Sequence, residues 1–324
     1  MKKSLFVYGL VIGLGIGVYY NCNNQKPNNK TQQDQQTNLD KQDQPNQLNQ
    51  QNKNNPEQNN LSPLEIKIAS FNIQVFGESK SKKKEIMDVL AKTIRNFDVV
   101  AIQEIRDDKN MALPYLIQII NETANSYAQK YNYIASPRLG RTNSKEQYAF
   151  IYNTSKIKPN GSNYVYNDIS DVFEREPFIT NFVSGKFDFS LVNIHTKPTD
   201  AKHEINALCD VVKDAVNRSP KNKDVIVLGD YNADGSYFSE SAITGFRVAQ
   251  YFLSIPDNFD TTVSENTNTY DRIVFQKQYT SEDFSGKVGV FRFDEEYHLS
   301  KQMAKQVSDH YPVWAVFYTD KDTD

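Results

Sequence analysis

The sequence predicts a layered α/β fold, in which helices cover the outer faces of packed, mixed β-sheets. Two patterns support this prediction. From Leu64 onwards, apolar runs of strand length alternate with segments whose apolar residues have helical spacing. Several strands also follow one another with no helix between them, which argues against a simple doubly wound parallel sheet. We therefore expect a folded domain over residues 64–320 that contains both parallel and antiparallel strands.

The individual strands are predicted from apolar runs rich in β-branched and aromatic residues. In chain order they are expected at residues 66–73, 98–104, 131–136, 147–152, 178–183, 190–195, 225–228, 271–275 and 312–318. The run Val225–Leu228 has four consecutive apolar residues, which is typical of a fully buried strand, and Gly229 is expected to end it. Helices are predicted where apolar residues recur every three or four positions, at residues 85–96, 111–126 and 201–217.

Two segments of different character precede this domain. Residues 1–20 begin with Met1-Lys2-Lys3 and continue without charge, which predicts a signal peptide or a membrane anchor. Residues 21–63 are more than half Asn and Gln and predict a disordered linker, because they contain too few apolar residues to offset chain entropy. We therefore expect a secreted or membrane-anchored protein with its folded domain outside the cell. Lipidation at Cys22 is an alternative way of attaching it to a membrane.

Charge and cysteine content exclude some classes of protein. The net charge of −3 gives no basic footprint of the kind that marks many nucleic-acid binders. A nucleic-acid substrate stays open, because a bound divalent cation can supply positive charge locally. Two cysteines exclude a framework of several disulfides, and they make a Cys–His zinc cluster a poor interpretation.

Polar side chains suited to metal binding or proton transfer recur at the ends of the predicted strands. These residues are Asn72, Glu104, His195, Asp230, Asn232, Asp271, Asp309 and His310. Because strands of one sheet can end at a common edge, we expect these side chains to converge in one site. Taken alone, Asp230 and Asn232 are equally well interpreted as turn residues, and His195 as an ordinary histidine at a strand end.

The chemistry of these side chains suits hydrolysis of a phosphoester. Carboxylate and amide oxygens favour Mg²⁺, Mn²⁺ or Ca²⁺ over zinc. Two of the four histidines, His195 and His310, lie at these strand ends, and histidine exchanges protons near neutral pH. One histidine that takes a proton from water and one that gives a proton to the leaving oxygen would suffice. The other two, His203 and His298, are expected on the surface.

Seven short blocks of sequence carry a resemblance to a known family. They are Ser70–Gly77, Ile102–Asp107, Leu139–Arg141 with Lys145–Tyr148, Arg175–Phe178, Gly229–Ala233, Tyr270–Val274 and Ser308–Pro312. In this order they resemble the deoxyribonuclease I family of the endonuclease/exonuclease/phosphatase superfamily, over about residues 66–316. The resemblance implies a four-layer α/β sandwich, with two packed mixed sheets flanked by helices. It also implies a divalent-metal-dependent endonuclease that leaves 5′-phosphate and 3′-hydroxyl ends on DNA.

The resemblance implies a role for each candidate catalytic residue. His310 would be the base that activates water, with Glu146 as its partner. His195 would be the acid that protonates the leaving oxygen, with Asp271 orienting it. Glu104 would be the principal metal ligand. The residues that would complete the metal and phosphate environment are Asn72, Asp230, Asn232 and Asp309.

Further residues would bind substrate or a second cation. Arg106, Arg175 and Arg141 would contact DNA, and Asp260 and Thr262 are candidate calcium ligands. The alternatives to these roles are that Arg106 and Arg175 are ordinary ion-pair partners, that Glu146 is a surface acid, and that Asp271 pairs with Arg272. The run Lys80–Lys84 is either a solvated loop and helix start or a contact to backbone phosphates.

Departures from the family leave the substrate open. Gly235 and Asn268 stand where animal secreted members have a cysteine pair, and Ser144 stands where many members have a tyrosine that stacks in the minor groove. The absence of this tyrosine would favour a preference of the enzyme for single-stranded DNA or RNA over duplex DNA. The alternatives are a phosphodiesterase or phosphatase of the same superfamily acting on RNA, or on a lipid or inositol phosphate, and a binding module without activity. The expected role is nucleotide scavenging by a monomer.

Overall fold

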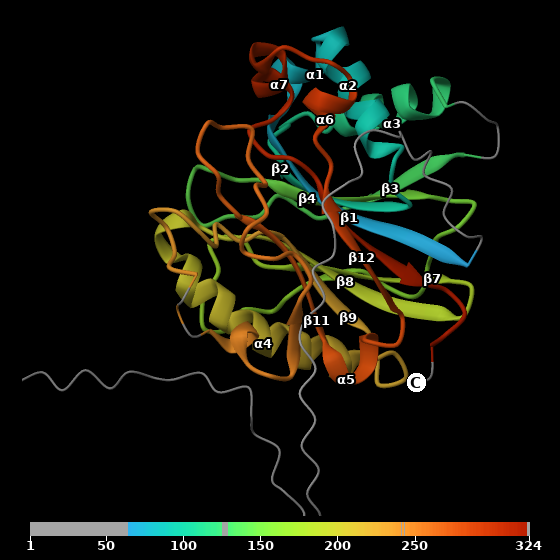
Figure 1. Ribbon diagram of the computed structural model, residues 1–324, viewed down its shortest axis with the longest axis vertical. Coiled ribbons are helices and arrows are strands. Elements are labelled where there is room, and N and C mark those ends of the chain that lie inside the picture. Colours follow the sequence, from blue (N-terminus) through green and yellow to red (C-terminus); the bar gives the residue numbers. More distant parts are fainter. Residues whose placement is uncertain (1–63, 125–128, 241, 243, 323–324) are drawn as a thin grey trace, which may run out of the picture.

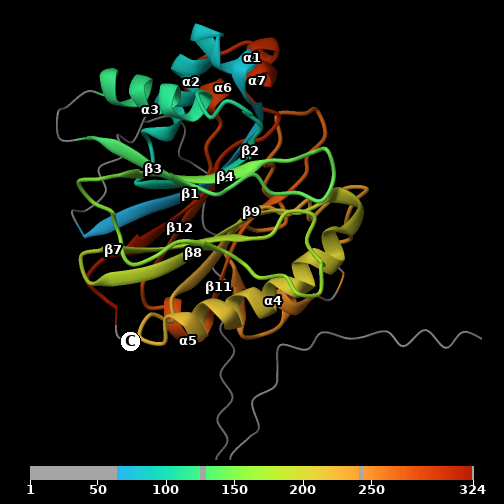
Figure 2. The same cartoon turned by 180° about the vertical axis from the view of Figure 1, so that it is seen from behind.

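Two mixed β-sheets pack face to face, and helices cover both outer faces, so that four layers are stacked (Figure 1). The computed structural model describes residues 64–124, 129–240, 242 and 244–322. The same four layers are seen from behind in Figure 2. The expected four-layer α/β sandwich is therefore confirmed.

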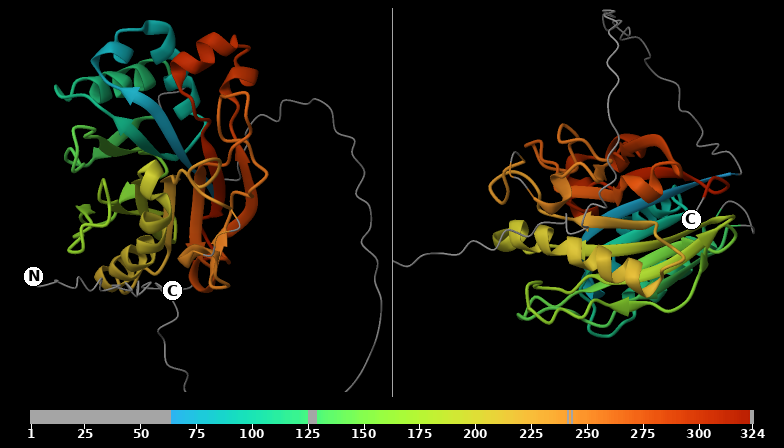
Figure 3. Two further views of the ribbon diagram at one scale, coloured as in Figure 1. Left: turned by 90° about the vertical axis from the view of Figure 1, so that its left-hand side faces the viewer. Right: turned by 90° about the horizontal axis from the view of Figure 1, so that it is seen from below.

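The first sheet has six strands in the order β12-β13-β1-β2-β4-β3. Their bounds are β1 (Glu65–Phe76), β2 (Val99–Ile105), β3 (Tyr131–Ala135), β4 (Gln147–Asn153), β12 (Phe284–Val290) and β13 (Val313–Tyr318). β1 is parallel to β2 and antiparallel to β13. The first and last strands of the domain are therefore neighbours (Figure 3).

The second sheet has seven strands, six of them in the order β10-β11-β9-β8-β7-β5, and the short β6 pairs with β7. Their bounds are β5 (Lys158–Pro159), β6 (Tyr164–Val165), β7 (Phe178–Ser184), β8 (Phe187–His195), β9 (Val225–Asp230), β10 (Tyr251–Leu253) and β11 (Asp271–Gln276). β8 and β9 are parallel, whereas β11 is antiparallel to β9.

Helices lie on each outer face, and the longer ones bury their apolar sides against one sheet. On the first sheet lie α1 (Glu78–Ser81), α2 (Lys84–Ile94), α3 (Ala112–Glu122), α6 (Phe293–Glu296) and α7 (Lys301–Val307). On the second sheet lie η1 (Pro198–Asp200), α4 (Ala201–Arg218) and η2 (Gly245–Arg247), while α5 (Lys277–Thr280) directly follows β11. In α2 the apolar positions repeat at helical spacing, which is why that face packs on the sheet.

The space between the sheets is filled largely by aromatic and branched side chains. Phe150 packs against Phe178 and Phe182 across this layer, with ring centroids 5.8 and 5.7 Å apart. Buried polar links also cross the layer; in one of them Gln103 Nε2 donates to Asn193 Oδ1 at 2.7 Å, and both side chains are fully buried. Such a link fixes the two sheets relative to each other more specifically than apolar packing does.

The topology delivers six strand ends to one edge of the sandwich. The carboxyl ends of the parallel pairs β1–β2 and β8–β9 lie there. The amino ends of β11 and β13 lie at the same edge, because these strands run antiparallel to β9 and β1. The predicted convergence of strand-end side chains therefore has a structural basis.

Some expected elements differ from the structure. Gly229 does not end its strand, and β9 continues to Asp230. The glycine is required because a Cβ there would lie 1.9 Å from the carbonyl oxygen of Ile194 in β8. The helix expected at 111–126 ends at Glu122, and β12 was not expected because polar residues and Gly286 interrupt its apolar pattern.

The expected signal peptide or anchor at residues 1–20 and the linker at residues 21–63 lie outside the described residues. Over the part of the chain that the structure does describe, no helix combines the length and apolar character needed to cross a membrane.

Candidate active site

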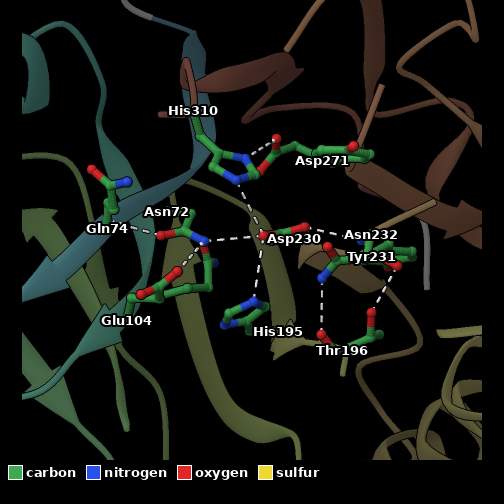
Figure 4. A network of polar contacts seen from close by, with 12 residues as sticks. Asn72, Gln74, Glu104, His195, Thr196, Asp230, Tyr231, Asn232, Asp271 and His310 are labelled. Carbon is green, nitrogen blue, oxygen red and sulfur yellow. Dashed lines mark hydrogen bonds and ion pairs between the residues drawn. The ribbon is translucent and has the colours of Figure 1, made fainter. Parts of the chain in front are cut away.

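The buried carboxylate of Asp230, at the end of β9, is the centre of the site (Figure 4). Its Oδ2 accepts a hydrogen bond from Asn72 Nδ2 at 3.0 Å. The same oxygen lies 3.5 Å from Nε2 of His195 and 3.5 Å from Nε2 of His310. Its Oδ1 accepts from the backbone N–H of Asn232 at 2.9 Å. The strand-end residues therefore converge, and the alternative that Asp230 and Asn232 are only turn residues is wrong.

Each histidine is held by a carboxylate on its other ring nitrogen. His310 Nδ1 lies 2.8 Å from Asp271 Oδ2, and His195 Nδ1 lies 2.9 Å from Glu146 Oε2. Both carboxylates are buried. A carboxylate on Nδ1 keeps that nitrogen protonated and leaves Nε2 to face the reacting atoms. In both pairs Nε2 points towards the carboxylate of Asp230.

The expected partners of the two histidines are exchanged. Glu146 was expected beside His310 and Asp271 beside His195, and the structure shows the reverse. The reason lies in the topology. Asp271 begins β11, and its backbone N–H donates to the hydroxyl of Thr261. The next residue, Thr262, forms a backbone bridge with His310, which brings His310 close to Asp271. Glu146 instead directly precedes β4 in the first sheet, and its carboxylate contacts His195. The alternatives that Glu146 is a surface acid and that Asp271 pairs with Arg272 are also wrong.

Burial and neighbouring charges act in opposite directions on the His195 pair. Burial would raise the pKa of Glu146, but His195, Arg175 and Arg106 outweigh it and lower the pKa to about 2. Burial would lower the pKa of His195, but the carboxylates of Glu146 and Asp230 raise it above its usual value. Both effects favour an ionised Glu146 beside a protonated His195.

The same competition acts around Asp230 and His310. Burial opposes ionisation of Asp230, but the two histidines lower its pKa overall. Burial likewise opposes protonation of His310, and the carboxylates of Asp271 and Asp230 raise its pKa well above the usual value. Burial and the nearby charge of Asp230 raise the pKa of Asp271. Asp230 is therefore the ionised group between two histidines that favour their protonated forms.

Glu104 and Asn72 form a second group of ligand atoms beside Asp230. Asn72 Nδ2 donates to Glu104 Oε1 at 3.1 Å, and the backbone N–H of Val75 donates to Glu104 Oε2 at 3.0 Å. The backbone here is strained, because φ is 62° at Glu104 and 46° at Asn232. Left-handed conformations of residues other than glycine cost about 1–3 kcal/mol each and are concentrated at functional sites.

The donor set fits a divalent cation. Ligand atoms of Asp230, Asp271 and His310 lie within 4.8 Å of one another, and all three residues are buried. Asp271 Oδ1 is buried without a hydrogen-bond partner, so it is available to a cation. Glu104 supplies further oxygen atoms nearby, whereas Asn72 directs Nδ2 towards Asp230 and its Oδ1 accepts from the N–H of Gln74. The half-exposed Asp309 has its Oδ1 3.9 Å from His310 Nε2. Three of the expected metal ligands, Glu104, Asn72 and Asp309, thus lie around Asp230 and His310, two residues that were expected to be catalytic.

The three expected DNA-binding arginines differ in their accessibility. Arg106 is partly exposed and its Nη2 lies 2.8 Å from Glu146 Oε1 and 3.2 Å from Glu104 Oε2. Arg175 is buried and contacts Glu146 and the backbone carbonyl of His195. Arg141 donates to the backbone of the 171–172 loop. Arg106 and Arg175 therefore are ion-pair partners in this structure, and DNA contact by any of the three stays a prediction.

The side chains of the expected calcium ligands bond to each other and to a neighbouring loop, although the backbone of Thr262 forms a bridge with His310. Asp260 Oδ1 accepts from the Thr262 hydroxyl at 3.1 Å, and Ser264 Oγ lies 3.0 Å from the same hydroxyl. Arg292 donates to Asp260 Oδ2 at 3.2 Å and so already supplies one positive charge. A calcium ion at Asp260 and Thr262 stays a prediction.

Three residues that bond to the backbone of the site were missed from the sequence. The hydroxyl of Tyr148 accepts from the backbone N–H of His195 at 2.9 Å. Ser308 Oγ donates to the carbonyl of Asn72 at 2.6 Å and accepts from the N–H of His310 at 3.1 Å. Tyr148 and Ser308 lie within two of the seven blocks that resemble the family, and this position was a signal that could have identified them. Lys80, described below, had no signal except its place in a lysine run. His203 and His298 are exposed, as expected.

Comparisons with known proteins agree with this geometry. The model of the endonuclease/exonuclease/phosphatase family matches residues 69–310. Deoxyribonuclease gamma of Homo sapiens is 38% identical over 264 residues, which cover 78% of this chain and 86% of that protein. Deoxyribonuclease-1 of Bos taurus is 36% identical over 262 residues, which cover 77% and 91%. A humanized TDP2 of D. rerio superposes with a TM-score of 0.54 at 14% identity, over 80% of this chain and 100% of that one, a likeness of fold alone.

The observed pairing predicts the effect of Glu146→Gln on the two histidines. Removing the carboxylate removes a favourable interaction with protonated His195, so the pKa of His195 should fall. His310 has Asp271 as its partner and should change much less. Titration of the imidazole resonances by NMR measures both, and the chain has only four histidines to resolve. A fall in pKa at His310 alone would contradict the observed pairing and would support the pairing of Glu146 with His310 that was expected from the sequence.

Proposed function

The chain belongs to the deoxyribonuclease I family of the endonuclease/exonuclease/phosphatase superfamily, and on this premise we propose that it is a deoxyribonuclease. One observation carries the proposal. Two histidine–carboxylate pairs present their Nε2 atoms to one buried carboxylate, at 3.5 Å each. Hydrolysis of a phosphodiester needs one group that takes a proton and one that gives a proton, and this arrangement supplies both.

The two histidines have opposite tasks in the proposed reaction. In its neutral form His310 takes a proton from water, and the hydroxide oxygen forms a bond to phosphorus. A cation bound beside Asp230 and Asp271 would favour the neutral form, because its charge opposes the effect of these carboxylates on the pKa of His310. His195 gives its proton to the 3′ oxygen as the bond from phosphorus to that oxygen breaks. The products are a 5′-phosphate and a 3′-hydroxyl. Asp271 keeps His310 in the tautomer whose Nε2 can accept a proton, and Glu146 keeps His195 protonated until the leaving oxygen takes its proton.

The residues that would hold Mg²⁺ or Mn²⁺ are Glu104, Asn72 and Asp309, with Asp230 and Asp271 beside them. A bound cation would stabilise the negative charge that grows on the phosphate oxygens. Asn232 donates through its backbone N–H to Asp230 and through Nδ2 to the carbonyl of Thr196, so it fixes the loop around the phosphate. Ca²⁺ at Asp260 and Thr262 would stabilise the neighbouring loop.

The substrate is proposed to be DNA, contacted by Arg106, Arg175 and Arg141. Of the two arginines bonded to Glu146, Arg106 is the more accessible to substrate, because its side chain is partly exposed whereas that of Arg175 is buried. The partly exposed Ser144 supports a test of single-stranded DNA and RNA beside duplex DNA, since serine has no ring to stack in the minor groove. A lipid or inositol phosphate is the other substrate class to test.

The nuclease proposal predicts metal-dependent cleavage of plasmid DNA. With Mg²⁺ or Mn²⁺ the wild type should nick and linearise the plasmid, and a chelator should stop it. His310→Ala should lose about 10²–10⁴-fold in rate, because a general base is removed. Glu104→Ala should lose about 10²-fold or more through the metal site. His203→Ala, on the exposed face of α4, is the matched control and should cleave like the wild type.

Two results would contradict this proposal. If DNA stays intact in every metal while RNA or an inositol phosphate is hydrolysed, the substrate class is wrong. If no phosphoester is hydrolysed, the fold serves as a binding module.

We further propose that residues 1–20 export or anchor the protein and that residues 21–63 hold the nuclease away from the membrane, where it would release nucleotides from extracellular DNA as a monomer. Fractionation of cells that express the full chain should find it in the membrane or the medium, accessible to external protease. Recovery from the cytoplasm in a protease-protected form would contradict this location.

A further inference from the structure

Lys80, on helix α1, directs its ammonium group into the backbone beside the active site. It donates to the carbonyl oxygens of Ile73 at 2.9 Å and of Gln74, at the end of β1. It also donates to the carbonyl oxygen of Val307 at 3.0 Å, at the end of α7. An ammonium has three donors, so these bonds use all of them. Lys82, in the same lysine run, is exposed and pairs with Glu78.

The two bonds to β1 act on the peptide units that orient the candidate metal ligands. The first unit has the N–H of Gln74, which donates to Asn72 Oδ1 at 2.9 Å. The second has the N–H of Val75, which donates to Glu104 Oε2 at 3.0 Å. A peptide unit is planar, so holding its oxygen fixes the direction of the N–H on the opposite side. Lys80 therefore sets the direction of both donors.

This part of β1 needs such support. Gln74 and Val75 have φ of 41° and 48°, a left-handed conformation that a β-branched residue rarely adopts. The pairing of β1 with β2 also shifts register between Asn72 and Phe76. The strand ladder alone therefore does not determine where these N–H groups point.

The third bond joins this segment to the one that carries His310. Val307 directly precedes Ser308, whose hydroxyl donates to the carbonyl of Asn72 and accepts from the N–H of His310. Lys80 and Ser308 thus fasten the same two segments together at adjacent points.

We propose that Lys80 is a positioning residue of the metal-dependent reaction, because its ammonium group clamps the end of β1 that holds Asn72 and Glu104 to the segment that carries His310. The inference rests on the proposed function for the identity of the metal ligands. It does not extend to contact with DNA, because the three donors are already bonded to protein.

The charge of Lys80 alone would have the opposite effect from the clamp. Burial lowers the pKa of Lys80 to about 8, while the nearby carboxylates of Asp309 and Glu104 favour the charged form. A positive charge beside these carboxylates repels a cation. Removing the charge would therefore tighten metal binding, whereas removing the clamp weakens it, and the sign of the change separates the two.

The test is Lys80→Met in the full chain, with Mn²⁺ binding measured by electron paramagnetic resonance without DNA. Glu104→Ala identifies the binding event that depends on that carboxylate. Lys80→Met should weaken this event by about 10- to 100-fold, as loss of groups that orient metal ligands does. Lys80→Arg keeps the charge but has a wider, planar head, and should also weaken it. Lys82→Met is the matched control and should bind Mn²⁺ like the wild type.

Thermal unfolding shows which variants are folded. If Lys80→Met does not fold, the test relies on Lys80→Arg. Unchanged or tighter Mn²⁺ binding by the folded variant would overturn the proposal, as would a wild type that binds no Mn²⁺ through Glu104. A salt-sensitive rise in KM for DNA with unchanged Mn²⁺ binding would mean a phosphate contact and would overturn it too. Cleavage of DNA by the wild-type preparation tests the proposed function separately, because the binding measurement needs no substrate.

Discussion

An ionised carboxylate buried between two histidines is the interaction on which the site depends. Asp230 is almost completely excluded from solvent, and an unpaired charge there would be costly. His195, His310 and Asn72 together compensate it. The compensation is mutual, because Asp230 raises the pKa of both histidines. The site is therefore one electrostatic unit, and a change at any member affects the others.

The fold brings this unit together by combining parallel and antiparallel strands. Parallel neighbours place Asn72 beside β2 and His195 beside Asp230, while antiparallel β11 places Asp271 opposite Asp230. The buried link from Gln103 to Asn193 holds the two sheets in register close to these ends. Each histidine then has its carboxylate partner on a different sheet: Glu146 lies at the first and Asp271 in the second.

The fold class and the converging strand ends could be predicted from the sequence. Apolar runs end in residues that can bind a metal, and the seven sequence blocks occur in the same order as in the deoxyribonuclease I family. The exchange of Glu146 and Asp271 could not, since it depends on which loops cross the strand ends. The role of Lys80 could not either, because a lysine bonded to three carbonyls looks the same in sequence as a solvated one. Polar interruptions hid β12 for a similar reason, because its pairing with β13 is a long-range interaction.

The central claim is that one carboxylate couples two histidines, and Asp230→Asn tests it most directly. The amide has nearly the same shape but no charge. NMR titration should then show the pKa of His195 and that of His310 falling together, with exposed His203 unchanged. A fall at only one histidine, or at neither, would contradict the account, because it would mean that Asp230 does not hold both pairs in one unit.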